Sequence, residues 1–78
     1  MKLQEVRKKA GLSQSELATK SSVNVRTIQE YEYGRKKIDA ARLDIILALA
    51  DVLLVPMSEL IEDAELAKKV KINAKREV

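Results

Sequence analysis

The hydrophobic and polar positions in the first half of the chain predict two short helices joined by a tight turn. Ser13 can accept a hydrogen bond from the backbone N–H of Glu16, whose carboxylate can reach back to the Ser13 N–H. This capping box predicts that a helix begins at Gln14. Asn24 repeats the N-cap signal further along, so a second helix is expected to begin at Val25.

The two predicted helices each carry one apolar face, through which they should pack together. The expected inward residues are Leu17, Ala18, Val23, Ile28 and Tyr31. The other face of the second helix carries Val25, Arg26, Gln29, Glu30 and Tyr33. A helix with a polar, hydrogen-bonding outer face and a short partner packed across it can lie in the major groove of DNA.

Two more helices flank this pair. An amphipathic helix is expected over residues 2–10, with Leu3, Val6 and Ala10 inward and Gly11 as its C-terminal stop. Asp39 is an N-cap candidate for a helix over residues 40–53. That helix is apolar around most of its circumference, so it should be central or partly covered by a partner.

Pro56 suits the first turn of a fifth helix. Its inward residues would be Leu60, Ile61 and Ala64. Periodicity leaves open whether this helix ends near Glu62 or runs on through residues 65–67.

Composition narrows the functional classes. Seventy-eight residues allow one compact core with short loops. Without Cys or His the chain lacks thiol nucleophiles, imidazole bases and the usual zinc ligands, so we expect no enzyme, metal or cofactor. It also lacks an apolar run of about 18 residues and an apolar N-terminal signal core, so no membrane association and a cytoplasmic location are expected.

The net charge of +3 is modest for a nucleic-acid binder, but it is unevenly placed. Arg26 and the run Arg35, Lys36 and Lys37 lie on the proposed DNA side, which suits a few phosphate contacts. A second basic stretch covers residues 68–78. We expect that stretch to be a solvated, poorly ordered end rather than a specific DNA contact.

Three motifs resemble those of the Xre/Cro-type family of small, repressor-like helix-turn-helix DNA-binding domains. They are G-L-S-Q-S-E-L-A, R-T-I-Q-E-Y-E-Y-G-R-K-K and V-P-M-S-E-L-I, within a match from about Lys2 to Ile61. The resemblance implies an all-α fold: a compact five-helix, lambda-repressor-like domain over residues 1–62. Residues 63–78 would then form a C-terminal extension, as a helix continuation, a dimer contact or a disordered tail.

The family also implies roles for single residues. Its third helix reads base edges, which assigns base reading to Val25, Arg26, Gln29 and Glu30. Backbone contacts fall to Gln14, Asn24, Thr27, Tyr33, Arg35, Lys36 and Lys37. In the family, the positions of Arg7 and Glu32 tend to hold a structural ion pair that ties the first helix to the third.

Some of these roles have rivals. Arg26 can pair with a guanine, a contact that discriminates by about 1–3 kcal/mol, but it can equally bind phosphate, stay solvated or pair with Glu30 within the helix. Gln14 at a helix N-terminus is a natural phosphate clamp.

The chain also departs from the family pattern. Ser22 stands where Gly is common and would need a positive φ angle. Leu54 stands where Gly often caps the fourth helix, so that end is expected to be sealed by packing. The spacing from Gly34 to the expected fifth helix is longer than in the commonest repressors, and Ile38 stands where a proline is frequent.

The sequence therefore predicts a sequence-specific, double-stranded DNA-binding transcriptional regulator. It would be a repressor that binds a palindromic operator as a homodimer, since two half-sites multiply specificity. The alternative is an antitoxin-like module that binds a partner protein through its C-terminal segment and autoregulates. A tail that orders only when a partner is added would favour that alternative.

Overall fold

The structure, a computed structural model, describes residues 2–76 and is built from helices alone within them. The α-helices are α1 (Lys2–Lys9), α2 (Gln14–Ser21), α3 (Val25–Glu32), α4 (Leu43–Leu53) and α5 (Ala64–Arg76). Two short 3₁₀ helices, η1 (Ile38–Ala40) and η2 (Met57–Glu59), flank α4. The predicted all-α class with five α-helices is confirmed, although two of the helices begin at unexpected places.

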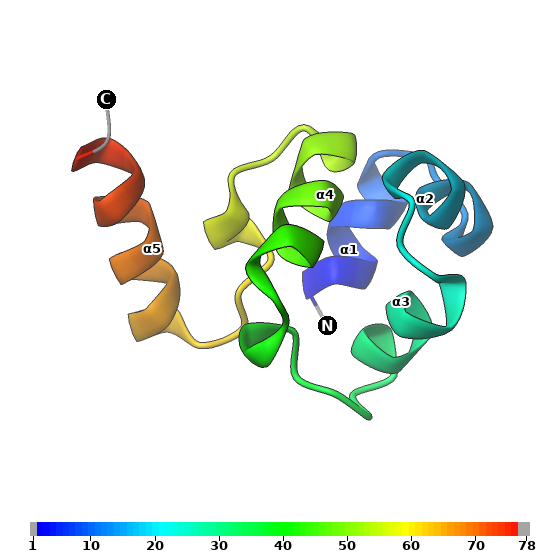
Figure 1. Ribbon diagram of the computed structural model, residues 1–78, viewed down its shortest axis with the longest axis horizontal. Coiled ribbons are helices and arrows are strands. Elements are labelled where there is room, and N and C mark those ends of the chain that lie inside the picture. Colours follow the sequence, from blue (N-terminus) through cyan, green and yellow to red (C-terminus); the bar gives the residue numbers. More distant parts are fainter. Residues whose placement is uncertain (1, 77–78) are drawn as a thin grey trace.

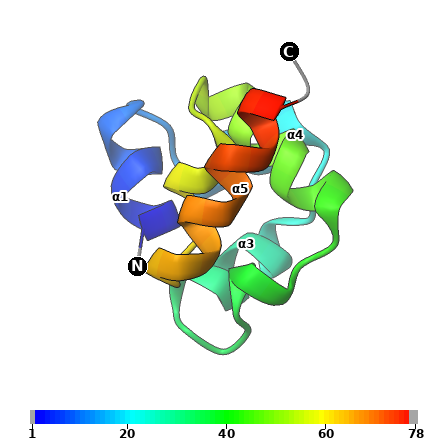
Figure 2. The same cartoon turned by 90° about the vertical axis from the view of Figure 1, so that its left-hand side faces the viewer.

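The helices are arranged along a molecule about 34 Å long. In Figure 1, α2 and α3 occupy one end, α1 and α4 lie in the middle, and α5 forms the other end. Helix α2 packs against α3 and α4, α1 packs against α3, and α5 packs mainly against η2. Figure 2 shows α5 crossing in front of the rest, with α1 and α4 to its two sides. Helices α3 and α5 therefore face different surroundings.

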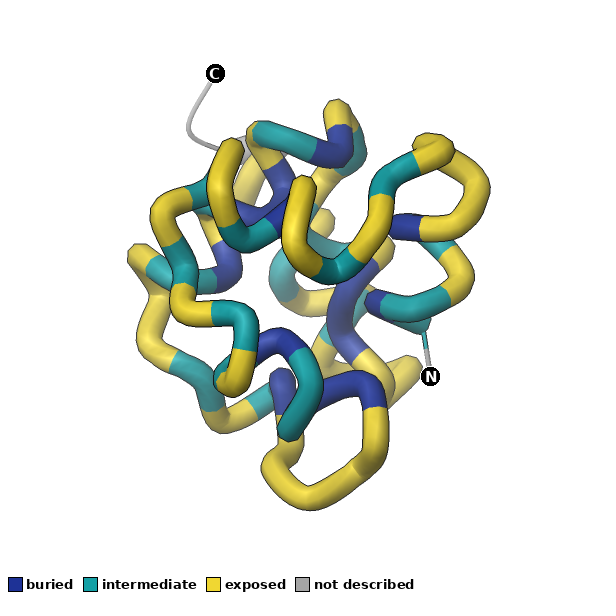
Figure 3. The backbone as a smooth tube through the Cα atoms, turned by 90° about the vertical axis from the view of Figure 1, so that its right-hand side faces the viewer, coloured by how far each residue is buried: buried dark blue, intermediate teal, exposed yellow. Residues whose placement is uncertain are grey.

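The core lies where the helices meet. Its most completely buried side chains are Leu3, Leu17, Ile28, Leu49 and Leu60. Burying each such side chain contributes about 1.5–3 kcal/mol. In Figure 3 the buried stretches turn inward, and the exposed stretches lie on the rim and in the loops. Leu17, Ile28 and Tyr31 are buried, as predicted, while Ala18 and Val23 pack partly buried against the same cluster.

The predicted helix ends around the turn are confirmed. The Glu16 N–H donates to Ser13 Oγ at 3.0 Å, and the Ser13 N–H donates to a Glu16 carboxylate oxygen at 2.9 Å, which completes the capping box. Asn24 Oδ1 accepts from the Arg26 N–H at 2.8 Å. Ser22 has φ 60°, as its place in the turn requires, although the left-handed region is unfavourable for a residue with a Cβ.

The start of the fourth helix was predicted wrongly. Helix α4 begins at Leu43, and Asp39 does not cap it. The Asp39 carboxylate instead accepts from the backbone N–H groups of Glu62 at 2.7 Å and Asp63 at 2.9 Å. Asp39 therefore fastens the loop after α3 to the segment that leads into α5, and residues 38–40 form the short helix η1.

The fifth helix was also placed wrongly. Residues 57–59 form only the 3₁₀ helix η2, and Ala64, expected inside, is exposed at the start of α5. Leu60 and Ile61 are buried as predicted. The chain leaves the helical path after them because Asp39 binds the next two N–H groups, and Asp63 then caps the new helix by accepting from the Leu66 N–H at 2.9 Å.

Three smaller expectations fail. Ala10 is exposed because α1 ends at Lys9. The basic stretch is helical as far as Arg76, so of the forms expected for the extension the helical one is found and the poorly ordered one is not, since Leu66, Ala67 and Val70 give α5 an apolar inner side. The end of α4 is not sealed by packing.

Leu54 ends α4 in the left-handed conformation, with φ 57° and 90% of its surface exposed. The helix end is closed by backbone bonds instead. The Leu54 N–H donates to the Asp51 carbonyl at 3.3 Å, and the Val55 N–H donates to the Ala50 carbonyl at 3.1 Å. A leucine thus occupies a position whose backbone geometry favours glycine.

Three leucines of α4 and its C-terminal end remain exposed: Leu43 by 62%, Leu47 by 44% and Leu54 by 90%. Leu43 and Leu47 lie about one turn apart on the same side of α4, and Leu54 follows the last residue of the helix; we call these three leucines the leucine edge. This matches the expectation that α4 has more apolar surface than a helix exposed to solvent usually carries.

Across residues 2–76, none of the helices combines the length and apolar character that a membrane crossing demands.

Candidate nucleic-acid interface

Helix α3 has one buried side and one open side. Ile28, Tyr31 and Glu32 are buried against the domain. The four residues predicted to read bases lie on the remaining surface: Arg26 is exposed, and Val25, Gln29 and Glu30 are partly exposed. Tyr33, just after the helix, is exposed as well. The open side of α3 therefore gathers hydrogen-bonding groups that can meet base edges.

A buried ion pair holds α3 to α1. Arg7 Nε lies 2.7 Å from Glu32 Oε2, and Arg7 Nη2 lies 3.0 Å from Glu32 Oε1. The third nitrogen, Arg7 Nη1, donates to the Leu12 carbonyl at 2.8 Å. The hydrogen bond to Glu32 raises the pKa of the Arg7 guanidinium above its usual value. The family resemblance implied a structural role for these two residues, and the contacts found are those of such a pair.

Gln14 extends this pair toward the open side. Its Nε2 donates to Glu32 Oε1 at 3.0 Å and to the Tyr33 hydroxyl at 3.3 Å. Its Oε1 accepts from Gln29 Nε2 at 3.3 Å. The sequence reading placed Gln14 at the DNA backbone and missed these contacts. The sequence did hold one signal for these contacts: Gln14 is a hydrogen-bonding residue at the start of one helix, and Glu32 was expected to be partly buried on the next.

Glu30 pairs with the loop and not with Arg26. Lys36 Nζ lies 3.6 Å from Glu30 Oε1, and the Glu30 carbonyl accepts from the N–H groups of Arg35 at 2.9 Å and Lys36 at 3.2 Å. Within the described residues no ion pair joins Arg26 to Glu30. The guanidinium of Arg26 therefore remains available to a ligand.

The loop after α3 carries exposed cations. Arg35, Lys36 and Lys37 follow Gly34, whose φ of 76° turns the chain away from the helix. This loop is the lowest, fully exposed bend in Figure 3. Three positive side chains beside the open side of α3 suit contact with phosphate groups.

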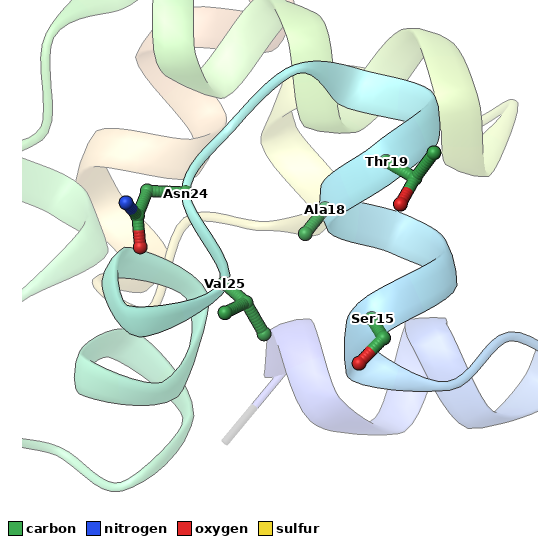
Figure 4. Close-up of a pocket in the computed structure, with 5 residues that line it drawn as sticks. All are labelled: Ser15, Ala18, Thr19, Asn24 and Val25. Carbon is green, nitrogen blue, oxygen red and sulfur yellow. The ribbon is translucent and has the colours of Figure 1, made fainter.

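An open hollow lies between α2 and α3 on the outside of the turn. Ser15, Ala18 and Thr19 line it from α2, and Asn24 and Val25 line it from the start of α3. Figure 4 shows the side chains of Ala18 and Val25 on its two sides. At the nearby start of α2, the N–H groups of Gln14 and Ser15 find no acceptor among the described residues. Such free N–H groups at a helix N-terminus favour anions.

Thr27 is partly exposed in the first turn of α3. The predicted backbone-contacting residues therefore divide into two groups. Gln14 and Asn24 lie at the helix starts, whereas Tyr33 and the basic loop lie at the far end of α3. The two groups flank the residues predicted to read bases.

Comparison with known proteins adds one finding. A family model described as helix-turn-helix matches residues 3–60, which is most of the chain. No curated protein and no solved structure matched the chain.

Proposed function

The chain belongs to the helix-turn-helix family of DNA-binding regulators, and from that premise we propose that it represses transcription as a dimer bound to a palindromic operator. The observation that carries the proposal is the open side of α3, which is polar, hydrogen-bonding and held in place by the buried Arg7–Glu32 pair. A domain of this size represses most simply by occupying its site.

In this proposal the open side of α3 enters the major groove. Arg26 pairs with a guanine, Val25 contacts a thymine methyl, and Gln29 and Glu30 hydrogen-bond to neighbouring bases. The Lys36 contact leaves Glu30 partly neutralised, which reduces its repulsion from nearby phosphates. Phosphates are contacted from both ends of α3, by Asn24, Thr27 and the start of α2 on one side and by Tyr33, Arg35, Lys36 and Lys37 on the other.

Selection from random duplex DNA tests the reading role. The wild type should enrich a motif with two inverted half-sites, with centres about one helical turn or 34 Å apart. The Arg26→Ala variant should lose the preference at one position of each half-site, at a cost of about 1–3 kcal/mol. Arg42→Ala is the matched control, because Arg42 is exposed beside Asp44 at the start of α4, outside α3 and its loop.

If the wild type enriches no motif at moderate salt, the proposed function is wrong. An unchanged motif in Arg26→Ala would remove only the base-reading role of Arg26. A loss of preference with Arg42→Ala as large as with Arg26→Ala would mean that net charge, not the position on α3, determines the effect.

We propose that the dimer forms through the leucine edge and the crevice beside it. The crevice lies between α4 and α5 and is lined mainly by apolar groups, among them Leu43, Ile46, Met57, Leu66 and Val70. Leu43 belongs to both features, so together they form a continuous apolar surface. Such surfaces on small proteins commonly mark contacts with another chain. A second copy on this side would leave the open side of α3 free.

Sedimentation equilibrium tests this surface. Leu43→Glu should shift the protein from dimer to monomer while leaving the fold intact, because Leu43 is mostly exposed in the single chain. Ile72→Glu is the control: Ile72 is 47% exposed, but it lies on the opposite side of α5 from Val70. A wild type that is monomeric with and without operator DNA would contradict the dimer.

The antitoxin-like alternative gains no support from the tail. That alternative would be favoured by a C-terminal segment that orders only when a partner is added. Helix α5 is already formed and packed on η2 in the single chain.

A further inference from the structure

Gln14 stands between a buried carboxylate and a residue on the open side of α3. Both oxygens of Glu32 accept from Arg7, and Glu32 Oε1 also accepts from Gln14. Gln14 in turn accepts from Gln29. A chain of hydrogen bonds thus runs from the centre of the domain to a side chain that faces solvent.

The chemistry of the groups fixes the direction of every bond in this chain. A carboxylate that is paired with a guanidinium has no proton to donate, so the Gln14 atom that faces Glu32 must be the NH₂ group. The oxygen of Gln14 must then face Gln29, and only the NH₂ group of Gln29 can donate to it. Reversing either amide would place two acceptors or two donors against each other.

The donors of Gln14 are fully used within the protein. An amide nitrogen carries two hydrogens, and those of Gln14 are directed at Glu32 Oε1 and the Tyr33 hydroxyl. Its side chain has no hydrogen left for a phosphate oxygen. The role expected for Gln14 from the sequence, a side-chain phosphate clamp, would require one of these two bonds to break.

We propose that Gln14 is a positioning residue that holds the Gln29 amide with its oxygen outward, so that the protein selects a base with an exocyclic amine at the position that Gln29 reads. This inference rests on the proposed function, because it assumes that α3 enters the major groove. In that groove the exocyclic amines belong to adenine and cytosine. Adenine fits best, because the second N–H of Gln29 can donate to its N7 atom while the amide oxygen accepts from its amine.

Selection from random duplex DNA, combined with a salt titration of binding, tests the positioning role. In the Gln14→Ala variant the Gln29 amide loses this hydrogen bond and can rotate so that its oxygen and nitrogen exchange places. Preference for the amine-bearing base should fall about tenfold at one position of each half-site, and the other positions should be unchanged. The salt dependence of binding should stay that of the wild type, because no phosphate contact is lost.

Two further variants make the result specific. Gln29→Ala should lose preference at the same position, and the Gln14→Ala/Gln29→Ala double variant should lose no more than Gln29→Ala alone. Gln4→Ala is the matched control, since Gln4 is the remaining glutamine of the chain and lies in α1. It should leave the motif unchanged. Thermal unfolding of each variant shows whether the fold is kept.

A phosphate clamp would give a different result. Gln14→Ala would then weaken binding to all sequences alike and lower the slope of log K against log salt by about one unit, which would overturn the proposal. A Gln14→Ala motif that keeps the full preference would overturn it as well. If the wild type enriches no motif, the proposed function itself fails, and the two failures are therefore distinguishable.

Discussion

The two ends of this molecule are stabilised in different ways. At the α2–α3 end, the buried polar groups of Arg7 and Glu32 are completely paired, and each helix start has a local cap. At the α4–α5 end, no side chain caps the start of α4, the segment leading into α5 is held by the distant Asp39, and leucines remain exposed. The first end thus holds its buried side chains by directional contacts, and our proposed function places DNA binding there. The second end keeps exposed leucines, and our proposal places the contact with a second copy of the chain there.

This difference has a physical reason. A side chain that reads bases must be held in one orientation, which a network of directional hydrogen bonds provides. A surface that joins two copies of a chain needs apolar area, which is not directional. Substitutions at the two ends should therefore have separate consequences.

The largest effect should come from Arg7→Met. The Glu32 side chain is fully buried, so removing its partner leaves a charge without compensation and should lower the free energy of unfolding by about 3–5 kcal/mol. Denaturant unfolding measures it. The double variant Arg7→Met/Glu32→Leu should regain most of the stability, since the buried charge is gone. A single-variant loss below about 1 kcal/mol would contradict the role given to this pair.

A smaller effect should follow from Asp39→Ala at the other end. Two backbone N–H groups lose their acceptor, so the start of α5 should loosen at a cost of about 1–2 kcal/mol. Hydrogen exchange should become faster in α5 and stay unchanged in α2 and α3. Asp44→Ala is the control, because Asp44 is an exposed aspartate whose ion pair is with Arg42. Faster exchange throughout the molecule would mean that the two ends do not behave separately.

Replacing Leu54 by glycine should stabilise the protein. The residue has positive φ and little buried surface, so Leu54→Gly should raise the free energy of unfolding by about 1 kcal/mol. Leu54→Ala keeps the Cβ atom and should give no gain. Ser22→Gly should give a similar gain at the first end, since Ser22 has nearly the same φ. Each substitution should be measured by thermal unfolding in a protein that also carries Leu43→Glu. That protein should be monomeric, so a change in stability cannot come from the dimer contact.

The smallest effect is a dependence on pH at the start of α2. The hydrogen bond from the Ser13 N–H lowers the pKa of Glu16 below its ordinary value of 4.5. Because the pKa is lower in the folded state, the contribution of Glu16 to stability is present above pH 4.5 and is lost as the pH falls through the lowered pKa. Glu16→Gln should flatten the stability profile in this acidic range. An equally steep profile in that variant would exclude Glu16 as its source.

The sequence predicts the first end better than the second. Ser13, Glu16 and Asn24 act on the two or three residues that follow them, so their caps can be recognised from local spacing. Asp39 is also a good N-cap residue, but its carboxylate accepts from N–H groups more than twenty residues away. Local spacing cannot show that Asp39 binds these distant groups and not the next helix. The starts of α4 and α5 were missed for this reason.

The candidate site shows the same limit. The open side of α3 follows from helical spacing, and the family resemblance assigns its roles. The link from Glu32 through Gln14 to Gln29 depends on where two helices approach each other, which no single helix specifies. The exposure of Leu54 depends in turn on the backbone geometry at the end of α4, which leucine does not favour.

The division between the two ends can be tested most directly by recording the backbone amide NMR signals of the protein with and without the selected operator duplex. We expect the largest changes at the start of α2, along α3 and in the loop of Arg35 to Lys37, whereas the exposed residues Lys68, Lys69 and Ile72 of α5 should not change. Changes centred on the basic side of α5, with α3 unaffected, would contradict it.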